Sequence, residues 1–144
     1  MTNTIKLRGM ANVSFWADDL QAAKVWYTKL LGVEPYFQSP NPENPAYIEY
    51  RIGDSQDELG IIDKKYAPPA ASMTGVGGAT LYWHVVDVEG MLAITKKLGA
   101  VEYEPLTERG VDWVTASVVD PFGNIIGFIH SPHYQEVWSS MGQG

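Results

Sequence analysis

The fold is decided by Asn12-Val-Ser-Phe-Trp-Ala-Asp-Asp-Leu20 and by a later stretch that resembles it, Thr80-Leu-Tyr-Trp-His-Val-Val-Asp-Val88. Each stretch is an alternating run that ends in an acidic residue, which is the pattern of a half-buried strand leading into a helix. Self-similarity of this kind indicates two copies of one structural unit. The chain is therefore predicted to begin each half with a strand and a helix.

Each predicted helix has a start and a stop signal. Asp19 and Asp87 carry a short carboxylate that can accept the free amides of a first helical turn. Gly32 and Gly99 can adopt the left-handed conformation that often ends a helix. Between these signals the apolar faces repeat at helical spacing, with Leu20, Ala23, Tyr27, Leu30 and Leu31 in the first helix and Val88, Met91, Thr95 and Leu98 in the second.

Three further strands are predicted in each half, at 33–38, 47–52 and 58–63 and again at 100–105, 113–119 and 124–130. Asp120-Pro-Phe-Gly-Asn124 has the composition of a turn between the last two strands. Residues 64–78, with Pro68-Pro69 and Gly75-Val-Gly-Gly78, have the composition of a connection between the halves. The residues alone thus predict an α+β protein with half-buried sheets.

Two tandem βαβββ modules with these motifs resemble the vicinal oxygen chelate superfamily, which includes glyoxalase, bleomycin resistance proteins and extradiol dioxygenases. The residues that carry the resemblance are Ala23-Lys-Val-Trp-Tyr27, Leu31-Gly32 and the Asp-Pro-x-Gly-Asn turn. It implies a single domain of residues 1–144, with modules 8–66 and 78–132 and a linker 67–77. It also implies that the two sheets form an open mixed β-barrel whose concave surface holds a ligand.

The resemblance also implies where a metal would bind, because metal enzymes of this superfamily draw ligands from the first and last strand of each module. Those positions hold Asn12, Ile61, Thr80 and Gly127, and the alignment at Ile61 can slip to Gly60 or Asp63. None of the four is His or Glu, whereas divalent ions need imidazole or carboxylate donors. We therefore expect no metal ligands and no cofactor.

The three histidines do not change this expectation. Pro132 within His130-Ser-Pro-His133 is expected to break any helix that would align both rings, so we interpret these two residues as exposed or capping in a tail. His84 shares the strand parity of Thr80, and we interpret it as a hydrogen-bonded pocket residue.

The resemblance implies that the family's ligand positions face inward, and counting in twos along the strands from those positions separates an inner surface from a helix-facing core. The predicted ligand-binding residues are Asn12, Ser14, Trp16, Tyr47, Glu49, Arg51, Tyr82, His84, Trp113, Thr115 and Gly127. The same count adds Thr80, Leu59, Ile61, Asp63, Ser117 and Ile129 to the lining. Four aromatic residues in this set favour a planar or partly apolar organic ligand. The alternative is that these rings pack against one another or against a partner subunit.

Two classes of function follow. The first is a metal-free protein that binds a small organic molecule by stacking. The second is an enzyme, either metal-free with Glu49 or His84 moving a proton, or a metal-dependent lyase, isomerase or dioxygenase whose ligands lie elsewhere. Because the chain has no cysteine, thiolate chemistry is excluded from both classes.

Composition limits the partners. A formal net charge of -7, with no run of Lys or Arg, removes the usual driving force for nucleic-acid binding. No stretch is apolar enough to span a membrane, and residues 1–10 have no signal-peptide pattern, so a soluble cytoplasmic protein is expected. The long linker and the exposed strand edges of an open barrel predict a homodimer.

Overall fold

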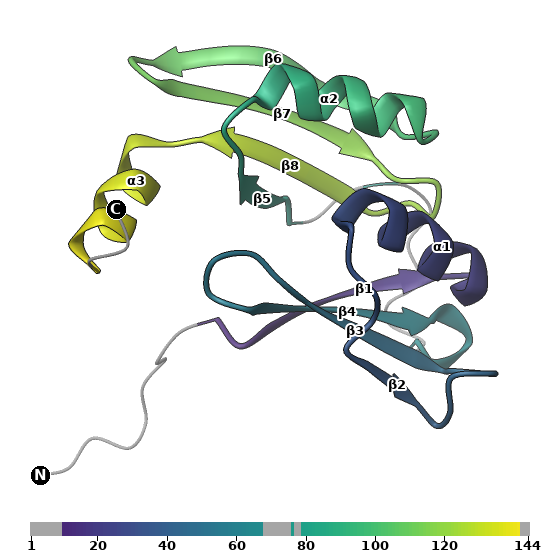
Figure 1. The fold of residues 1–144 in the computed structure, drawn as a ribbon. Coiled ribbons are helices and arrows are strands. Elements are labelled where there is room, and N and C mark those ends of the chain that lie inside the picture. The colour runs from purple at the N-terminus through teal and green to yellow at the C-terminus, as the bar shows by residue number, and fades with distance from the viewer. Residues whose placement is uncertain (1–9, 68–75, 77–78, 142–144) are drawn as a thin grey trace, which may run out of the picture. The chain divides into compact units, whose positions relative to one another are not determined.

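The computed structural model describes residues 10–67, 76 and 79–141 (Figure 1). The chain divides into two compact units, Met1–Pro68 and Pro69–Gly144. Each unit contains one four-stranded mixed sheet, and each is described separately below. The predicted linker 67–77 lies almost entirely outside the described residues.

Unit 1 has the predicted order strand, helix, three strands. Its elements are β1 (Asn12–Ala17), α1 (Leu20–Leu31), β2 (Phe37–Ser39), β3 (Tyr47–Ile52), β4 (Asp57–Asp63) and the short 3-10 helix η1 (Lys64–Tyr66). The sheet order is β1-β4-β3-β2, with β1 parallel to β4 and the other neighbours antiparallel. The strand predicted at 33–38 is short, since only Phe37–Ser39 pairs with β3.

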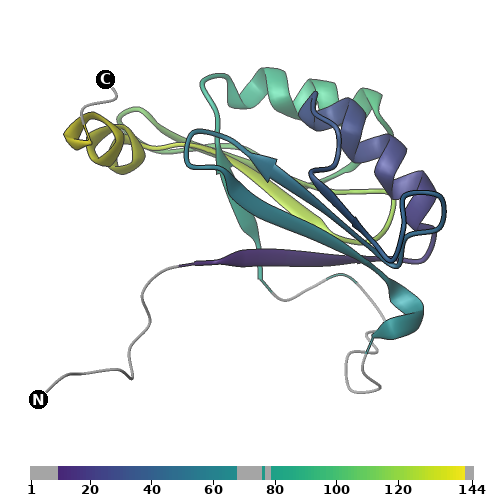
Figure 2. The same ribbon diagram turned by 60° about the horizontal axis from the view of Figure 1, so that its bottom comes forward.

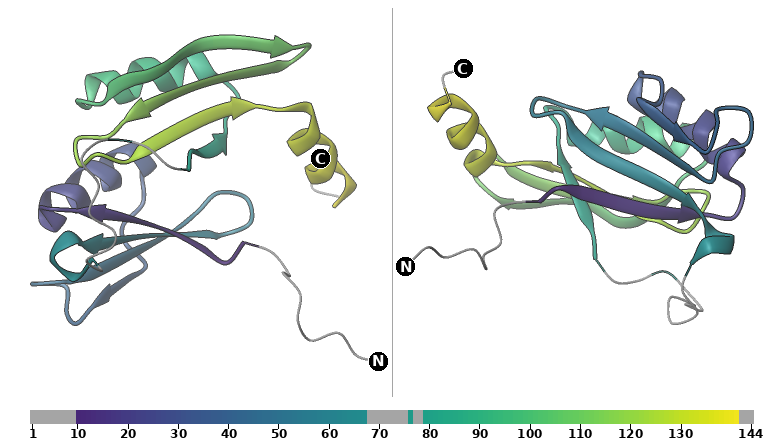
Figure 3. Two further views of the ribbon diagram at one scale, coloured as in Figure 1. Left: turned by 180° about the vertical axis from the view of Figure 1, so that it is seen from behind. Right: turned by 90° about the horizontal axis from the view of Figure 1, so that it is seen from below.

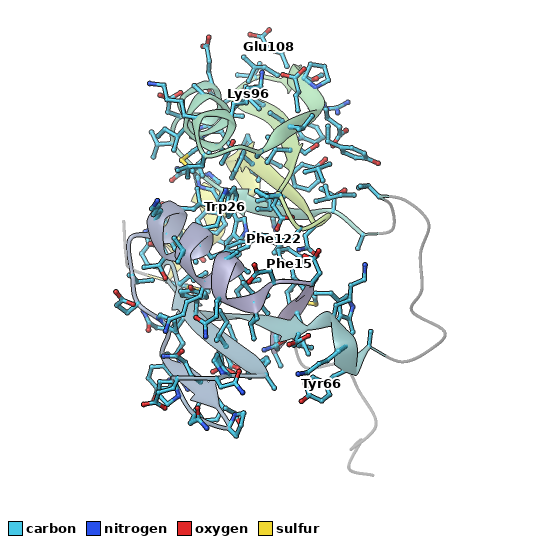
Figure 4. The ribbon with its side chains drawn as sticks, turned by 90° about the vertical axis from the view of Figure 1, so that its right-hand side faces the viewer. Phe15, Trp26, Tyr66, Lys96, Glu108 and Phe122 are labelled. Carbon is cyan, nitrogen blue, oxygen red and sulfur yellow. The ribbon has the colours of Figure 1, made fainter. Side chains whose placement is uncertain are left out.

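Helix α1 begins and ends where the sequence predicts. The Asp19 carboxylate accepts a hydrogen bond from the amide of Ala22, and Gly32 ends the helix with φ of 72°. The helix covers the sheet face that carries the buried Ile48. Phe15, labelled in Figure 4, belongs to the same face, because its ring centroid lies 6.3 Å from that of Tyr27 on α1.

Unit 2 repeats this arrangement. Its elements are β5 (Leu81–His84), α2 (Val88–Lys97), β6 (Val101–Gly110), β7 (Trp113–Val119), β8 (Ile125–His130) and α3 (Pro132–Ser140). The sheet order is β5-β8-β7-β6, with β5 parallel to β8. Helix α2, capped by Asp87, lies along one face of this sheet (Figure 2). The core on that face contains Ala116, Val118, Ile126 and Phe128.

The turn between β7 and β8 is also confirmed. Oδ1 of Asp120 accepts hydrogen bonds of 2.8 Å from the amides of Phe122 and Asn124, and Gly123 has φ of 92°. A short acceptor followed by Pro and Gly is the composition that such a turn needs. The α+β fold of two βαβββ repeats is therefore present as predicted.

The interpretation of the C-terminal residues as a tail was wrong. Helix α3 continues from the end of β8 (Figure 3), and Pro132 stands in its first turn. Ser131 caps the helix by accepting a hydrogen bond from the amide of Tyr134. Proline is favourable at this position because the first helical amides have no partner within the helix.

The strand register corrects the predicted lining of β4. Leu59 and Ile61 pair with Val13 and Phe15, and both are fully buried on the face that α1 covers. The assignment of Leu59, Ile61 and Asp63 to the inner surface was thus wrong by one residue.

We call the sheet face opposite each helix the open face. On β4 the open face carries Glu58, Gly60 and Ile62, which pair with Asn12, Ser14 and Trp16 of β1.

Candidate functional site

On the open face of unit 1, four of the predicted ligand-binding residues form one hydrogen-bonded chain. Ser14 Oγ donates to Asn12 Oδ1 (2.6 Å), and Asn12 Nδ2 donates to the Tyr47 hydroxyl (3.3 Å). The Tyr47 hydroxyl donates to Glu49 Oε1 (2.8 Å). Strands β1 and β3, which flank β4, therefore hold these side chains in fixed positions.

The Tyr47 phenol acts as a donor in this chain. Burial raises its pKa above the usual value, and so does the hydrogen bond to Glu49. A phenol with a raised pKa stays protonated at neutral pH. Tyr47 thus orients the Glu49 carboxylate and is not itself a base.

The remaining predicted residues of unit 1 form none of these hydrogen bonds. Trp16 is half-buried at the end of β1. The guanidinium of Arg51 lies 3.7 Å from the centre of the Tyr36 ring, a cation–π contact that sequence reasoning missed. The adjacent aromatic residues Tyr36 and Phe37 were the only signal for it.

The open face of unit 2 carries a second polar cluster, which we call the Glu104 cluster: Tyr82, Glu104, Arg109, Thr115 and Ser117. The Tyr82 hydroxyl and Ser117 Oγ both donate to Glu104 Oε1, at 2.7 and 2.9 Å. Arg109 Nε donates to Thr115 Oγ1 at 3.1 Å, and its Nη2 lies 3.8 Å from Glu104 Oε2. Tyr82 and Thr115 were predicted for the site, whereas Glu104 and Arg109 were missed.

The two hydroxyl donors define the charge state of Glu104. The hydrogen bonds from Tyr82 and then Ser117 lower the pKa of the Glu104 carboxyl, whereas burial and the bond to Glu104 raise the pKa of Tyr82. Glu104 is therefore an anion and Tyr82 a neutral phenol at neutral pH.

The glycines at the last-strand position explain why a metal site of the family type does not fit. Gly60 lies opposite Ser14 and Glu49, and Gly127 lies opposite Tyr82 and Ser117, so the two are equivalent in register. A Cβ at Gly60 would be 2.6 Å from Tyr47 Cε1, and one at Gly127 would be 2.7 Å from Tyr82 Cε1. In both units a tyrosine ring occupies the space where the ligand side chain would project.

The other metal positions fit no better. The Asn12 side chain already forms hydrogen bonds with Tyr47 and Ser14, and the Thr80 hydroxyl is a weak neutral metal ligand. Among residues 10–67, 76 and 79–141, no group of three His, Cys, Asp or Glu side chains is placed to hold an ion. The residues present therefore do not match the family's metal chemistry.

His84 lies in a stack of rings at the end of β5. Its ring is parallel to that of Tyr134 on α3, with centroids 4.2 Å apart and planes at 10°, and it lies 5.1 Å from the His130 ring. His130 Nδ1 is within hydrogen-bond distance of the Val85 carbonyl (3.1 Å) and is half-buried, whereas His133 is exposed as predicted.

Trp113 begins β7, and nearly half of its surface (46%) is exposed. It pairs with Gly110 of β6, and a Cβ added at Gly110 would be 3.4 Å from Trp113 Cε3. The ring is therefore not part of the buried core of unit 2.

The family model of the Glyoxalase/Bleomycin resistance protein/Dioxygenase superfamily matches residues 9–128. The match covers most of the chain, and the chain belongs to this superfamily. Helix α3 lies beyond the matched residues. Comparison with curated protein sequences gave no significant match.

Solved structures share the fold. A glyoxalase-related enzyme from Fulvimarina pelagi is 20% identical with a TM-score of 0.70, over 88% of this chain and 90% of that one. A superfamily member from Sphaerobacter thermophilus is 13% identical with a TM-score of 0.67, over 87% and 98%. A family enzyme from Burkholderia phytofirmans is 16% identical with a TM-score of 0.65, over 83% and 95%.

None of the helices in the described residues has the length and hydropathy of a membrane span.

Proposed function

We propose that this protein binds a small, planar, partly aromatic organic molecule on its open faces without a family-type metal centre. The observation that carries the proposal is the open face of unit 2, where the Glu104 cluster includes one exposed ring, Tyr82, and a second exposed ring, Trp113, lies two residues from Thr115 on β7. Tyr82 and Trp113 are 37% and 46% exposed. Rings that are available to solvent and adjoin fixed polar groups are the usual composition of an organic-ligand site.

Tyr82 has a defined orientation, which favours stacking. Its ring lies on Gly127, and its hydroxyl is fixed by Glu104. A ring held in this way loses little conformational freedom when a ligand stacks on it. We retain the eleven predicted residues as ligand-binding residues of the two open faces, each face taken by itself, and add Glu104 and Arg109 to that of unit 2.

Binding is favoured over proton transfer by the surroundings of the two catalytic candidates. The Glu49 carboxylate accepts the Tyr47 hydrogen bond, and one face of the His84 ring is covered by Tyr134. Both side chains are thus held by neighbours within their own unit. An enzyme of the same superfamily is the alternative, and conversion of a bound probe would identify it.

The test is an NMR titration of the full-length protein with planar bicyclic probes such as 2-naphthamide. We expect shifts of Trp113 and Tyr82 signals, and a loss of affinity in Trp113→Ala but not in Trp138→Ala, which changes a tryptophan of α3. No shift at any open-face residue would overturn the proposal. Chemical change of the probe would replace binding by catalysis.

We further propose that the protein is a cytoplasmic homodimer. The edge strands are β1 and β2 in one sheet and β5 and β6 in the other, and unpaired edges favour association of sheets.

A further inference from the structure

Strand β6 does not follow regular alternation, and this decides where Glu104 lies. Glu102 pairs with Val118 and Glu104 with Ser117, so one extra residue, Tyr103, is inserted between them. In a regular strand Glu102 and Glu104 would share a face. The bulge separates them, because Glu102 forms an ion pair with Lys96 of α2 (2.8 Å) whereas Glu104 turns to the open face.

A second register shift follows at once. Thr107 pairs with Thr115, although three residues of β6 span the distance that two residues of β7 cover. β-Bulges commonly redirect side chains next to functional sites. A third shift lies between Glu108, which pairs with Val114, and Gly110, which pairs with Trp113, and Arg109 is its extra residue. The three shifts together place Glu104 and Arg109 where they contact Tyr82, Ser117 and Thr115.

The two oxygens of Glu104 have different surroundings. Oε1 accepts both hydroxyl hydrogen bonds, from Tyr82 and Ser117. Oε2 faces the Arg109 guanidinium at 3.8 Å, which is beyond hydrogen-bond length. Arg109 uses its Nε to donate to Thr115, and its Nη2 is the atom that faces Glu104 Oε2. The side chains of Arg109 and Glu104 are 42% and 33% exposed, which makes the pair accessible.

At this separation the ion pair offers an acceptor, Glu104 Oε2, beside a donor, Arg109 Nη2, with no net charge. A ligand group that fits it must supply a donor to Glu104 Oε2 and an acceptor to Arg109 and must itself be neutral. A carboxylate would be repelled by Glu104 and an ammonium by Arg109. The planar carboxamide or lactam edge has the required pattern.

Building on the proposed function, we propose that the Glu104–Arg109 pair is a binding site for a neutral carboxamide or lactam group carried by a planar aromatic ligand. The amide N–H donates to Glu104, the carbonyl oxygen accepts from Arg109, and the ring lies toward the exposed faces of Tyr82 and Trp113.

The test compares three probes that share one ring: 2-naphthamide, 2-naphthoate and 2-naphthylmethylammonium. We expect the wild-type protein to bind the amide roughly tenfold more tightly than either charged probe, since each charged probe leaves a like charge opposed. Glu104→Gln should make naphthoate the preferred probe, and Arg109→Gln should make the ammonium preferred. Glu102→Gln, on the α2 side of the same strand, should keep the wild-type order.

The outcomes separate the two proposals. Equal affinity for all three probes, or a wild-type preference for a charged one, overturns the carboxamide site and leaves ligand binding in place. An unchanged order in both Glu104→Gln and Arg109→Gln also overturns it. If none of the three probes binds, the proposed function fails together with this inference.

Discussion

The contact between Gly127 and Tyr82 gives a sharp prediction, because adding one methyl group at Gly127 should destabilise the fold. A Cβ there would lie 2.7 Å from Tyr82 Cε1 and 2.9 Å from Cγ, and these atoms are too close to the ring attachment for a small rotation to relieve the overlap. The ring must leave its place, and the hydrogen bond to Glu104 must break with it.

The magnitude follows from two opposing effects. In open space, Gly→Ala in a strand stabilises by roughly 0.5–1 kcal/mol. Overpacking costs about 1–3 kcal/mol, and loss of a hydrogen bond to a charged group costs about 1.5–3 kcal/mol where the group is buried. Because Tyr82 is 37% exposed, its ring can swing into solvent and avoid part of the overpacking. We expect a net loss of roughly 1–2 kcal/mol.

Urea unfolding of Gly127→Ala followed by circular dichroism measures this loss. The matched control is Gly110→Ala, where the new Cβ would be 3.4 Å from Trp113 Cε3, a tolerable contact, and we expect it to stay within about 0.5 kcal/mol of wild type. In a Tyr82→Ala background Gly127→Ala should become neutral or stabilising, because the obstructing ring is gone. A stabilising Gly127→Ala, or additive effects of the two changes, would refute the reasoning.

Four further predictions can be tested separately. Trp113→Ala should weaken binding of 2-naphthamide about tenfold and lower the free energy of unfolding by less than roughly 1.5 kcal/mol. Truncation of a core tryptophan would cost about 3–5 kcal/mol, and a loss of that size with unchanged affinity would contradict the proposed site. Tyr82→Phe should be less stable than wild type at pH 6–8, and the difference in the free energy of unfolding should shrink as the pH falls below about 4. The reason is that a lowered Glu104 pKa stabilises the fold only while the carboxyl is ionised. A difference that does not change with pH would contradict this linkage. Elemental analysis of dialysed protein should find no stoichiometric transition metal, and one retained equivalent of zinc, iron, manganese or nickel would show that the ligands lie elsewhere. Sedimentation should give the mass of a homodimer, whereas a concentration-independent mass of a single chain would rule it out.

The parts of the fold that were predictable from the sequence depend on local signals. Asp19 and Asp87 cap the helices through their own side chains, and the Asp120 turn is closed by residues within five positions. Helix α3 had such a signal as well, since Ser131 followed by Pro132 is a typical helix start. It was missed because proline was interpreted as a helix breaker and not as a first-turn residue.

The residues of the open faces were predictable only where the strands are regular. Along β1 and β3, alternation correctly brought Asn12, Ser14, Tyr47 and Glu49 to one face. Along β4, the register depends on pairing with β1, and an alignment wrong by one residue moved Ile61 to the wrong face. Along β6, the register depends on pairing with β7. Pro105, which lies within the second register shift, was a local signal, since proline within a strand occurs at edges and bulges, but it does not give the register.

In each unit a tyrosine ring lies over the glycine of the last strand, and the tyrosine comes from a different strand in the two units. Tyr47 reaches Gly60 from β3, whereas Tyr82 reaches Gly127 from β5. In both cases the hydroxyl donates to a glutamate, Glu49 or Glu104, on another part of the open face. A carboxylate on the glycine strand would point into the space that the ring now fills. Each open face therefore has a glutamate that is oriented by a tyrosine hydroxyl and that can accept a hydrogen bond from an organic ligand.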